Sequence, residues 1–477
     1  MTRTPHRSLP VLLFALVWLS VAWFGCWAWN PNTAVRMFAA AAIVEEHQPT
    51  IDRFAHLTID RAQFGGNFYM DKAPGMTLMA LPAVAIADVL EDASSVGMAM
   101  DVSDPALDRY MRLRVWLAAA MINATLLAFA SAAMFDIGRR TSGATSAGLF
   151  AALGFALGTP LWGWSTTLFG HAPVASLLVI AIWLVMRGTL RGRATPGRYP
   201  SLAGLTLGWA LVIEHSALLF ALPIGLWALW RMRTLRPAVA RRAIVEAVIG
   251  GVLAAVPLLG YNLFAFGDPF RLGYQGVVGF DGMKQGLFGL TRPSSAALVE
   301  ILVGARRGML WVAPILVIAP FGLARLWRRG ERSLVALAVS GAVIAFLYNA
   351  SYVYWDGGNS TGPRHAMPAI AFLALGFAPL WAAATPIARV PLAALLAASM
   401  TINCTIAAAE ITAPQHIPNA LVDAVWLGRF VPGYLRTIPS EWFGYTAWQG
   451  LGMYLGLAAL LLAALVIAAR QARLPNI

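Results

Sequence analysis

The side chains best suited to chemistry lie in residues 30–74, directly after a first apolar run. This stretch holds five carboxylates and four cations: Glu45, Glu46, Asp52, Asp60, Asp71, Arg36, Arg53, Arg61 and Lys72. A carboxylate can take a proton from a hydroxyl group, and a nearby cation can stabilise negative charge that develops during a reaction. Asp71 and Lys72 precede Ala73 and Pro74, and a proline permits a helix to start just after Lys72.

Lysine is rare in this chain, which makes its position informative. The sequence has only two lysines, Lys72 and Lys284, and uses arginine for every other basic side chain apart from histidine. This choice indicates that a compact ammonium group is needed at residue 72. The simpler interpretation is that Lys72 only pairs with Asp71 at an interface, and both interpretations stay open.

Two further polar segments interrupt the apolar sequence. Residues 352–368 read YVYWDGGNSTGPRHAMP and contain Trp355, Asp356, Arg364 and His365. Their glycines would let the backbone and the Arg364 guanidinium approach an anion together. Residues 261–274 read YNLFAFGDPFRLGY and begin at Tyr261. Aromatic residues at such positions usually form interfacial belts, and Trp355 fits a belt and a binding role equally well.

Three ionisable residues lie next to or inside apolar runs. Glu214 and His215 separate two short apolar runs, and His171 follows the turn WGWSTTLFG. An ionisable residue at membrane depth is by default a functional candidate. If the turns lie at the membrane surface, however, these side chains are simply solvated.

The composition excludes a soluble globular protein. Of the 477 residues, 59% are hydrophobic and 12% are charged, and the mean hydropathy is +0.67. Soluble domains have roughly 25% charged residues. The net charge is +13, but the basic residues form short clusters between apolar runs, so they indicate membrane topology rather than nucleic-acid binding.

The sequence predicts an all-α polytopic membrane protein that forms a single domain over residues 1–477. About twelve apolar runs are long enough to be membrane spans: 9–29, 113–135, 144–160, 172–187, 201–214, 217–230, 244–265, 309–328, 333–353, 366–385, 390–411 and 449–469. The run 75–91 contains Pro82 and Asp88, and we interpret it as a surface-lying or re-entrant helix.

The arginine clusters predict the orientation, because positive charge stays on the cytoplasmic side. With the spans above, all clusters fall on one side: Arg3/Arg7, Arg139/Arg140, 187–198, 231–242, 325–332, Arg389 and Arg470/Arg473. Both termini are therefore expected in the cytoplasm. The outer segments are 30–112, 262–308, 354–365 and 412–448, and residues 33–45 have the spacing of an amphipathic helix on the membrane surface.

Several common motifs are absent from the sequence. It has no Walker loop, no GxGxxG between a strand and a helix, no HExxH, no CxxC and no Asp-x-Asp pair. A cytoplasmic ATP site and a soluble nucleotide-sugar donor are therefore disfavoured. No cofactor is required, and a divalent metal is optional and not indicated.

Two motifs carry a resemblance to a known family. Asp71–Lys72–Ala73–Pro74, after a first span and a long outer segment, resembles the acid-Lys-Pro-Pro motif of membrane-embedded GT-C glycosyltransferases. The similar branch contains protein O-mannosyltransferases and lipid A aminoarabinose transferases. The segment Trp-Asp-Gly-Gly to Gly-Pro-Arg-His (355–365) resembles a motif of uncharacterised bacterial members.

The resemblance implies an enzyme of the outer face of a bacterial inner membrane. It would transfer a hexose or pentose, with inversion, from a polyprenyl-phosphate donor to a lipid, glycan or protein acceptor. A GT-C-like fold with about twelve transmembrane helices and juxtamembrane helices in the first outer segment is expected. The partners would be these substrates and membrane lipids, and no nucleic acid. The alternative is a transporter or lipid flippase without bond chemistry.

One feature departs from the family pattern. Family members have an acidic residue closely after the first span, but this chain has Trp29-Asn30-Pro31-Asn32-Thr33 there. We therefore predict Asp60 as the base, Asp52 as the second candidate, and Asp71 as an acceptor or sugar contact. The remaining predicted site residues are Lys72, Arg364 and His365 for the donor phosphate, and Arg36, His171, Tyr261, Trp355 and Asp356 for the substrates.

Overall fold

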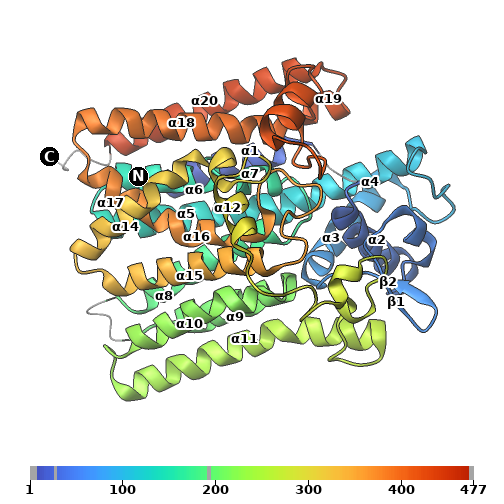
Figure 1. Cartoon of the computed structure of the whole chain (residues 1–477), viewed down its shortest axis with the longest axis horizontal. Coiled ribbons are helices and arrows are strands. Elements are labelled where there is room, and N and C mark those ends of the chain that lie inside the picture. Colours follow the sequence, from blue (N-terminus) through green and yellow to red (C-terminus); the bar gives the residue numbers. More distant parts are fainter. Residues whose placement is uncertain (1–7, 26–28, 191–194, 472–477) are drawn as a thin grey trace.

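The chain folds into a long bundle of helices with a smaller group of elements at one end (Figure 1). The structure is a computed structural model that describes residues 8–25, 29–190 and 195–471. The predictions that concern Arg3, Arg7, Arg473 and the residues 191–194 of the cluster 187–198 lie outside the described residues.

Helices and two short strands follow one another along the chain. The helices of the first half are α1 (Ser8–Ala22), α2 (Pro31–Glu46), α3 (Gly75–Glu91), α4 (Pro105–Ala118), α5 (Thr125–Ser142), α6 (Thr145–Ala156), α7 (Leu161–Trp164), α8 (His171–Gly188), α9 (Tyr199–Ile213) and α10 (Ala217–Met232). Those of the second half are α11 (Pro237–Phe266), α12 (Ser295–Val303), α13 (Met309–Val312), α14 (Ala319–Arg328), α15 (Arg332–Ser351), α16 (Pro368–Leu373), α17 (Phe377–Ala383), α18 (Pro386–Ala409), α19 (Ile438–Trp442) and α20 (Ala447–Gln471). The strands β1 (Ala62–Phe64) and β2 (Asn67–Tyr69) form an antiparallel hairpin.

Helices occupy all twelve predicted spans, so the all-helical polytopic architecture is confirmed. Within the described ranges, seven helical segments are long and apolar enough to cross a membrane, and α1, α6, α9 and α10 are shorter apolar helices. The first helix is shorter than predicted and ends at Ala22, because Phe24 leaves the helix to pair with Thr437. The span 309–328 is broken into α13, a 3-10 turn and α14.

The outer surface of the bundle is apolar, as lipid contact requires. Helix α11 is the clearest case, because only 17% of its most apolar 18-residue stretch is buried inside the protein. Val248, Val252 and Val256 on this helix are all more than half exposed. Soluble proteins rarely expose continuous apolar patches of this size. We therefore describe the chain as spanning a membrane.

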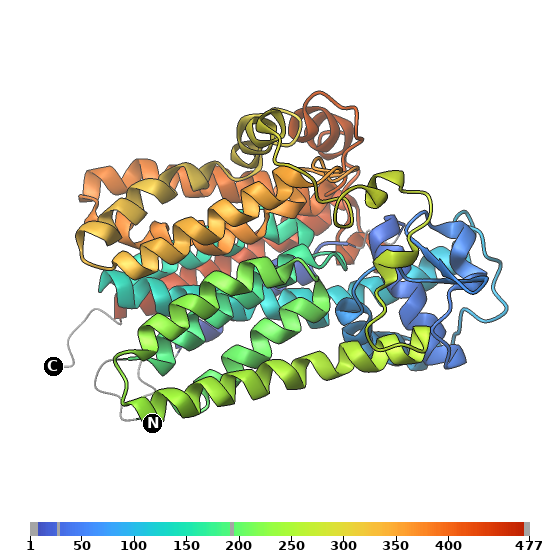
Figure 2. The same ribbon diagram turned by 60° about the horizontal axis from the view of Figure 1, so that its bottom comes forward.

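The two ends of the bundle differ in character. The start of α1, the end of α20 and the linkers α5–α6, α10–α11 and α14–α15 lie at one end (Figures 1 and 2). The predicted outer segments gather at the opposite end, where α2, α3, β1 and β2 lie. The predicted separation of arginine-rich linkers from outer segments is thus present in the fold, and the side that each faces stays a prediction.

Helix α2 differs from its prediction as an amphipathic surface helix. Every residue from Asn32 to Ala42 is buried, and α2 packs against α3 and α4. Four consecutive alanines, at residues 39–42, allow neighbouring helices to approach it from several directions. The buried helix therefore acts as a support, and it holds the Arg36 guanidinium inside the protein.

Candidate active site

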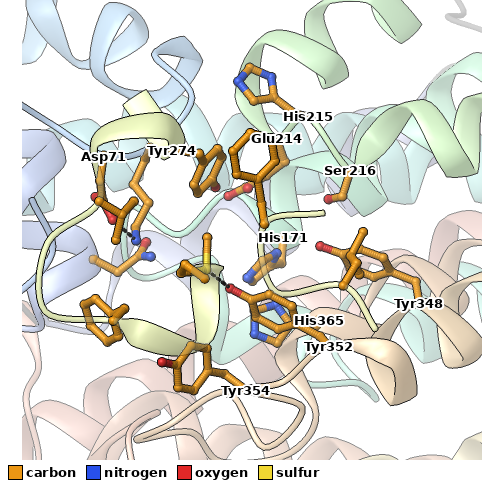
Figure 3. Close-up of a pocket in the computed structure, with 18 of the residues that line it drawn as sticks. Asp71, His171, Glu214, His215, Ser216, Tyr274, Tyr348, Tyr352, Tyr354 and His365 are labelled. Carbon is orange, nitrogen blue, oxygen red and sulfur yellow. Dashed lines mark hydrogen bonds and ion pairs between the residues drawn. The ribbon is translucent and has the colours of Figure 1, made fainter. Parts of the chain in front are cut away.

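A cavity of about 410 Å³ lies where the first predicted outer segment meets the bundle helices (Figure 3). Its polar wall consists of Asn32, Asp60, Asp71, Lys72, His171, Glu214, His215, Ser216, Tyr274, Tyr348, Tyr352, Tyr354, Arg364 and His365. These residues come from segments far apart in the sequence. The cavity therefore unites the first outer segment, the α9–α10 turn, the segment after α11 and the segment after α15.

Lys72 forms the centre of a cluster of charges on one side of the cavity. Its Nζ lies 2.7 Å from Asp71 Oδ2 and 3.2 Å from Asp60 Oδ2. Burial lowers the pKa of Lys72, but Asp60 and Asp71 together raise it more, so it stays above the ordinary value. Burial raises the pKa of Asp71, against the opposing effect of Lys72. Lys72 pairs with Asp71 as the simpler interpretation expected, and it also faces the cavity.

Arg364 and His365 lie in a short 3-10 turn, Arg364–Ala366, just before α16. The Arg364 guanidinium stacks on the buried Phe169 ring, with its Cζ 4.9 Å from the ring centroid. Among the described residues, Arg364 forms no ion pair, and its buried Nε has no hydrogen-bond partner. Both ring nitrogens of His365 are also buried without a partner. The Arg364 Nε–H and the one N–H of a neutral His365 ring are therefore available to a ligand that supplies acceptor oxygens.

Arg36 and Glu214 form a second pair of charges. Arg36 is fully buried on α2, and its Nη2 lies 2.8 Å from Glu214 Oε1. Glu214 is at the end of α9, directly before the turn into α10, and is 7% exposed. Glu214 is therefore not a solvated turn residue. This favours the interpretation that Glu214 and His215 belong to a functional site.

Aromatic and histidine rings form the opposite part of the wall. The His365 ring makes edge contacts with His171, at 4.9 Å between ring centroids, and with Tyr352, at 5.0 Å. Tyr274 contacts His215 at 5.8 Å, and burial raises the pKa of Tyr274 well above its ordinary value. Tyr274 therefore stays a neutral hydrogen-bonding group at any physiological pH.

Three carboxylates and three cations lie in or beside the cavity, so their charges balance, but the ion pairs among them are uneven. Asp60 and Asp71 share Lys72, and Glu214 pairs with Arg36. Within the part of the chain that the structure describes, this leaves Arg364 as the cavity's one cation without a carboxylate partner. An anion that enters the cavity would find the Arg364 guanidinium without a contacting carboxylate, although Asp60 and Glu214 act on it electrostatically, and the Lys72 ammonium shared by two carboxylates.

Residues 267–294, here called the cover segment, form part of the cavity wall. Val278 donates a hydrogen bond to the Arg61 carbonyl oxygen, and Gly282 donates one to Tyr354 Oη at 3.0 Å. The segment thus joins β1 to the residues after α15, and Figure 2 shows it beside the first outer segment. It contributes mainly apolar side chains to the wall: Leu272, Val277, Phe280, Met283, Leu287, Phe288 and Leu290.

The structure brings together most of the residues predicted from the sequence. Asp60, Asp71, Lys72, His171, Arg364 and His365 line the cavity. Arg36 lies beside it and acts through Glu214. Sequence reasoning did not select Asn32, Ser216, Tyr348, Tyr352 or Tyr354, because polar and aromatic residues at helix ends are common at membrane interfaces.

Three predicted substrate contacts lie outside the cavity wall. Tyr261 is buried on α11 among aromatic rings, including Phe266. The Trp355 ring stacks with Arg306. Asp356 accepts hydrogen bonds from Gln415 Nε2 and from the Gly358 amide.

The segment around Asp356 is fixed by a buried cation. Arg307 is fully buried and donates to the carbonyl oxygens of Asp356, Gly358 and Pro414. Gly357 and Gly358 line the cavity. Arg307 and Asp356 therefore shape the glycine segment that precedes Arg364, and neither of them lines the cavity.

Asp52 is also outside the cavity. Its side chain is exposed and accepts a hydrogen bond from the Phe68 amide in the β hairpin. Asp52→Asn is expected to leave the turnover number unchanged, because the amide oxygen can accept the same hydrogen bond and no reacting group is removed. Comparing the rate of donor consumption with that of the unmodified protein would check this, and a large loss would restore Asp52 as a candidate base.

The described residues contain no group of three or more His, Cys, Asp and Glu side chains arranged to hold a metal ion. The positive charge of the cavity comes from the side chains of Lys72 and Arg364.

Comparison with known proteins gives similarity at the level of solved structures. No family model and no curated protein matches the chain. The chain is similar to the crystal structure of ArnT from Cupriavidus metallidurans bound to undecaprenyl phosphate, with 15% identity and a TM-score of 0.48 over 99% of this chain and 78% of that one. For ArnT of the same organism in the apo state, the identity is 16% and the TM-score is 0.49 over 98% and 77%.

Proposed function

We propose that this protein is a GT-C-type membrane glycosyltransferase that uses a polyprenyl-phosphate-linked sugar. One observation is central: Arg364, which forms no ion pair among the described residues, lines the same cavity as Lys72 and three carboxylates, and aromatic and aliphatic side chains form much of the remaining wall. This is the combination that transfer from a lipid phosphate needs. It requires positive charge for the leaving phosphate, a carboxylate for the acceptor proton, and a dry environment.

The donor phosphate is placed at Arg364 and Lys72, with His365 as a further hydrogen-bond donor. Arg364 is the stronger contact in this arrangement, because the charge of Lys72 is already shared by Asp60 and Asp71. The lipid part has an apolar path, since Leu218 and Leu219 of α10 line the cavity and Leu218 is half exposed on the outside of the bundle. A polyprenyl chain would gain free energy from this apolar contact.

The proposed reaction is a single displacement with inversion. The acceptor oxygen forms a bond to the anomeric carbon while the bond from that carbon to the phosphate oxygen breaks. The phosphate leaves with the electron pair, and a carboxylate of the cavity receives the acceptor proton. Asp60 is the base that the sequence ranked first, and a base in position contributes about 10²–10⁴-fold to the rate.

The proposed setting is the outer face of a bacterial inner membrane, with both termini in the cytoplasm and the cavity facing outward. The acceptor would be a lipid, glycan or protein hydroxyl. The partners are therefore the lipid-linked donor, this acceptor and the surrounding membrane lipids.

Metal independence is a testable part of this proposal. We expect donor consumption to continue in excess EDTA, because Arg364 and Lys72 supply the charge that a metal would otherwise provide. The measurement compares initial rates with EDTA and with EDTA plus excess Mg²⁺ or Mn²⁺. A rate that falls in EDTA and recovers with either metal would contradict this expectation.

Donor consumption tests the function itself. The purified protein in nanodiscs would be given a panel of undecaprenyl-phosphate hexoses and pentoses, with crude membrane extract as the source of acceptor. Release of undecaprenyl phosphate from one member of the panel would support the transferase. If no donor is consumed, but a lipid-linked sugar crosses the bilayer of a proteoliposome, the protein is a transporter or flippase.

A further inference from the structure

The base is the part of the proposed reaction that the sequence leaves open, and Glu214 offers an answer. Three carboxylates line the cavity: Asp60, Asp71 and Glu214. Two of them, Asp60 and Asp71, contact Lys72 directly. In the proposed reaction Lys72 holds the leaving phosphate, so these two carboxylates adjoin the leaving group.

An inverting displacement places the base elsewhere. The acceptor attacks the anomeric carbon on the face opposite the leaving phosphate. A carboxylate that forms an ion pair with the phosphate-binding lysine is therefore on the side of the leaving group, away from the attacking acceptor. In Figure 3, Glu214 and Asp71 lie on different sides of the Tyr274 ring, and Glu214 reaches the cavity from the α9–α10 turn.

The contacts of Glu214 suit a proton acceptor. Its Oε1 accepts a hydrogen bond from Arg36 Nη2 at 2.8 Å, and no described residue hydrogen-bonds its Oε2. Arg36 is fully buried and is not part of the cavity wall, so it serves as a fixed counter-charge for Glu214. A buried carboxylate needs such a partner. One oxygen is thus held in place while the other is available to an acceptor hydroxyl.

Space for the carboxylate depends on a glycine. Gly170 precedes His171 at the start of α8, and a Cβ atom at residue 170 would overlap the Glu214 carboxylate. Alanine at this position would push the carboxylate from its place without removing its charge.

We propose that Glu214 is the general base of the transfer reaction. The acceptor O–H proton moves to Glu214 Oε2 as the acceptor oxygen bonds to the anomeric carbon. The carbon–oxygen bond to the phosphate breaks, and the phosphate keeps the electron pair beside Arg364 and Lys72. This assignment rests on the proposed function, and it gives Asp60 the role of holding Lys72 in position.

The test uses azide, an anionic nucleophile from which no proton has to be removed. Glu214→Gln is expected to lower kcat with the membrane-extract acceptor by about 10²–10⁴-fold and to leave the Kd for undecaprenyl phosphate unchanged. With azide as the acceptor, the same variant should form glycosyl azide at the unmodified protein's rate. Glu300→Gln is the matched control, because Glu300 lies on α12 outside the cavity wall.

Two further variants keep the test informative if Glu214→Gln does not fold. Glu214→Asp retains the charge that faces Arg36 and should keep part of the activity. Gly170→Ala retains both charged groups and should lower kcat, with recovery by azide. Each variant would be compared by thermal unfolding before its rate is measured.

The other outcomes separate this assignment from the proposed function. If Glu214→Gln transfers sugar at the normal rate, or if azide does not restore it, Glu214 is not the base and the transferase stands. If azide restores Asp60→Asn instead, the base is Asp60. If the unmodified protein consumes no donor of the panel, the proposed function fails and this assignment fails with it.

Discussion

Arg364→Ala is expected to weaken the binding of undecaprenyl phosphate by about 10²–10³-fold, which is within the roughly 2–5 kcal/mol range for losing one partner of a buried charge pair. The reason is the arrangement of ion pairs, in which Arg364 is the cation of the cavity that no carboxylate contacts among the described residues. The Kd would be measured by titrating the purified protein in nanodiscs with undecaprenyl phosphate.

Two other variants define the specificity of this effect. Arg292→Ala removes an exposed arginine from the cover segment and should leave the Kd unchanged. Arg364→Lys keeps the positive charge but not the planar group that stacks on Phe169, so partial binding is expected. An unchanged Kd in Arg364→Ala would rule out Arg364 as the main phosphate contact.

Lys72→Ala is expected to reduce folding stability by about 3–5 kcal/mol, the range for breaking a buried ion pair from one side. Without the ammonium group, Asp60 and Asp71 would remain as two neighbouring carboxylates, 8% and 2% exposed, with no shared counter-charge. Chemical or thermal unfolding of the protein in detergent would measure the loss.

A double variant separates the structural role of Lys72 from its role in binding. Lys72→Ala combined with Asp71→Asn should recover much of the stability, because one of the two unpaired carboxylates is neutralised. It should not recover the affinity for undecaprenyl phosphate, because the ammonium group is still missing. If affinity returns together with stability, Lys72 maintains the fold and does not bind the phosphate.

The helices were predictable because the information that specifies them is local. Apolar runs of sufficient length produced helices at every predicted span, and the arginine-rich linkers mark one end of the bundle. The exceptions have tertiary causes. Helix α1 ends early because Phe24 pairs with Thr437, and α2 is buried because α3 and α4 cover it.

The sequence predicted which residue types would form the candidate site better than it predicted which residues would contact one another there. Lys72 was identified because lysine is rare in this chain. Arg364 was identified because a glycine-rich segment precedes it. The sequence offered Asp60 and Asp52 as the first and second candidates for the base. In the structure, Asp60 lies in the cavity wall and Asp52 on the surface. The sequence also left Glu214 undecided between a solvated turn and a buried site.

The sequence by itself determined that this protein is a helical membrane protein with its reactive groups in a few polar segments, because length, apolarity and charge are properties of each segment. Only the tertiary structure decided that Asp60 and Asp71 share one lysine, that Arg36 holds Glu214, and that Arg364 is left unpaired. Such pairings depend on which distant segments meet when the helices pack, and local sequence patterns do not encode that.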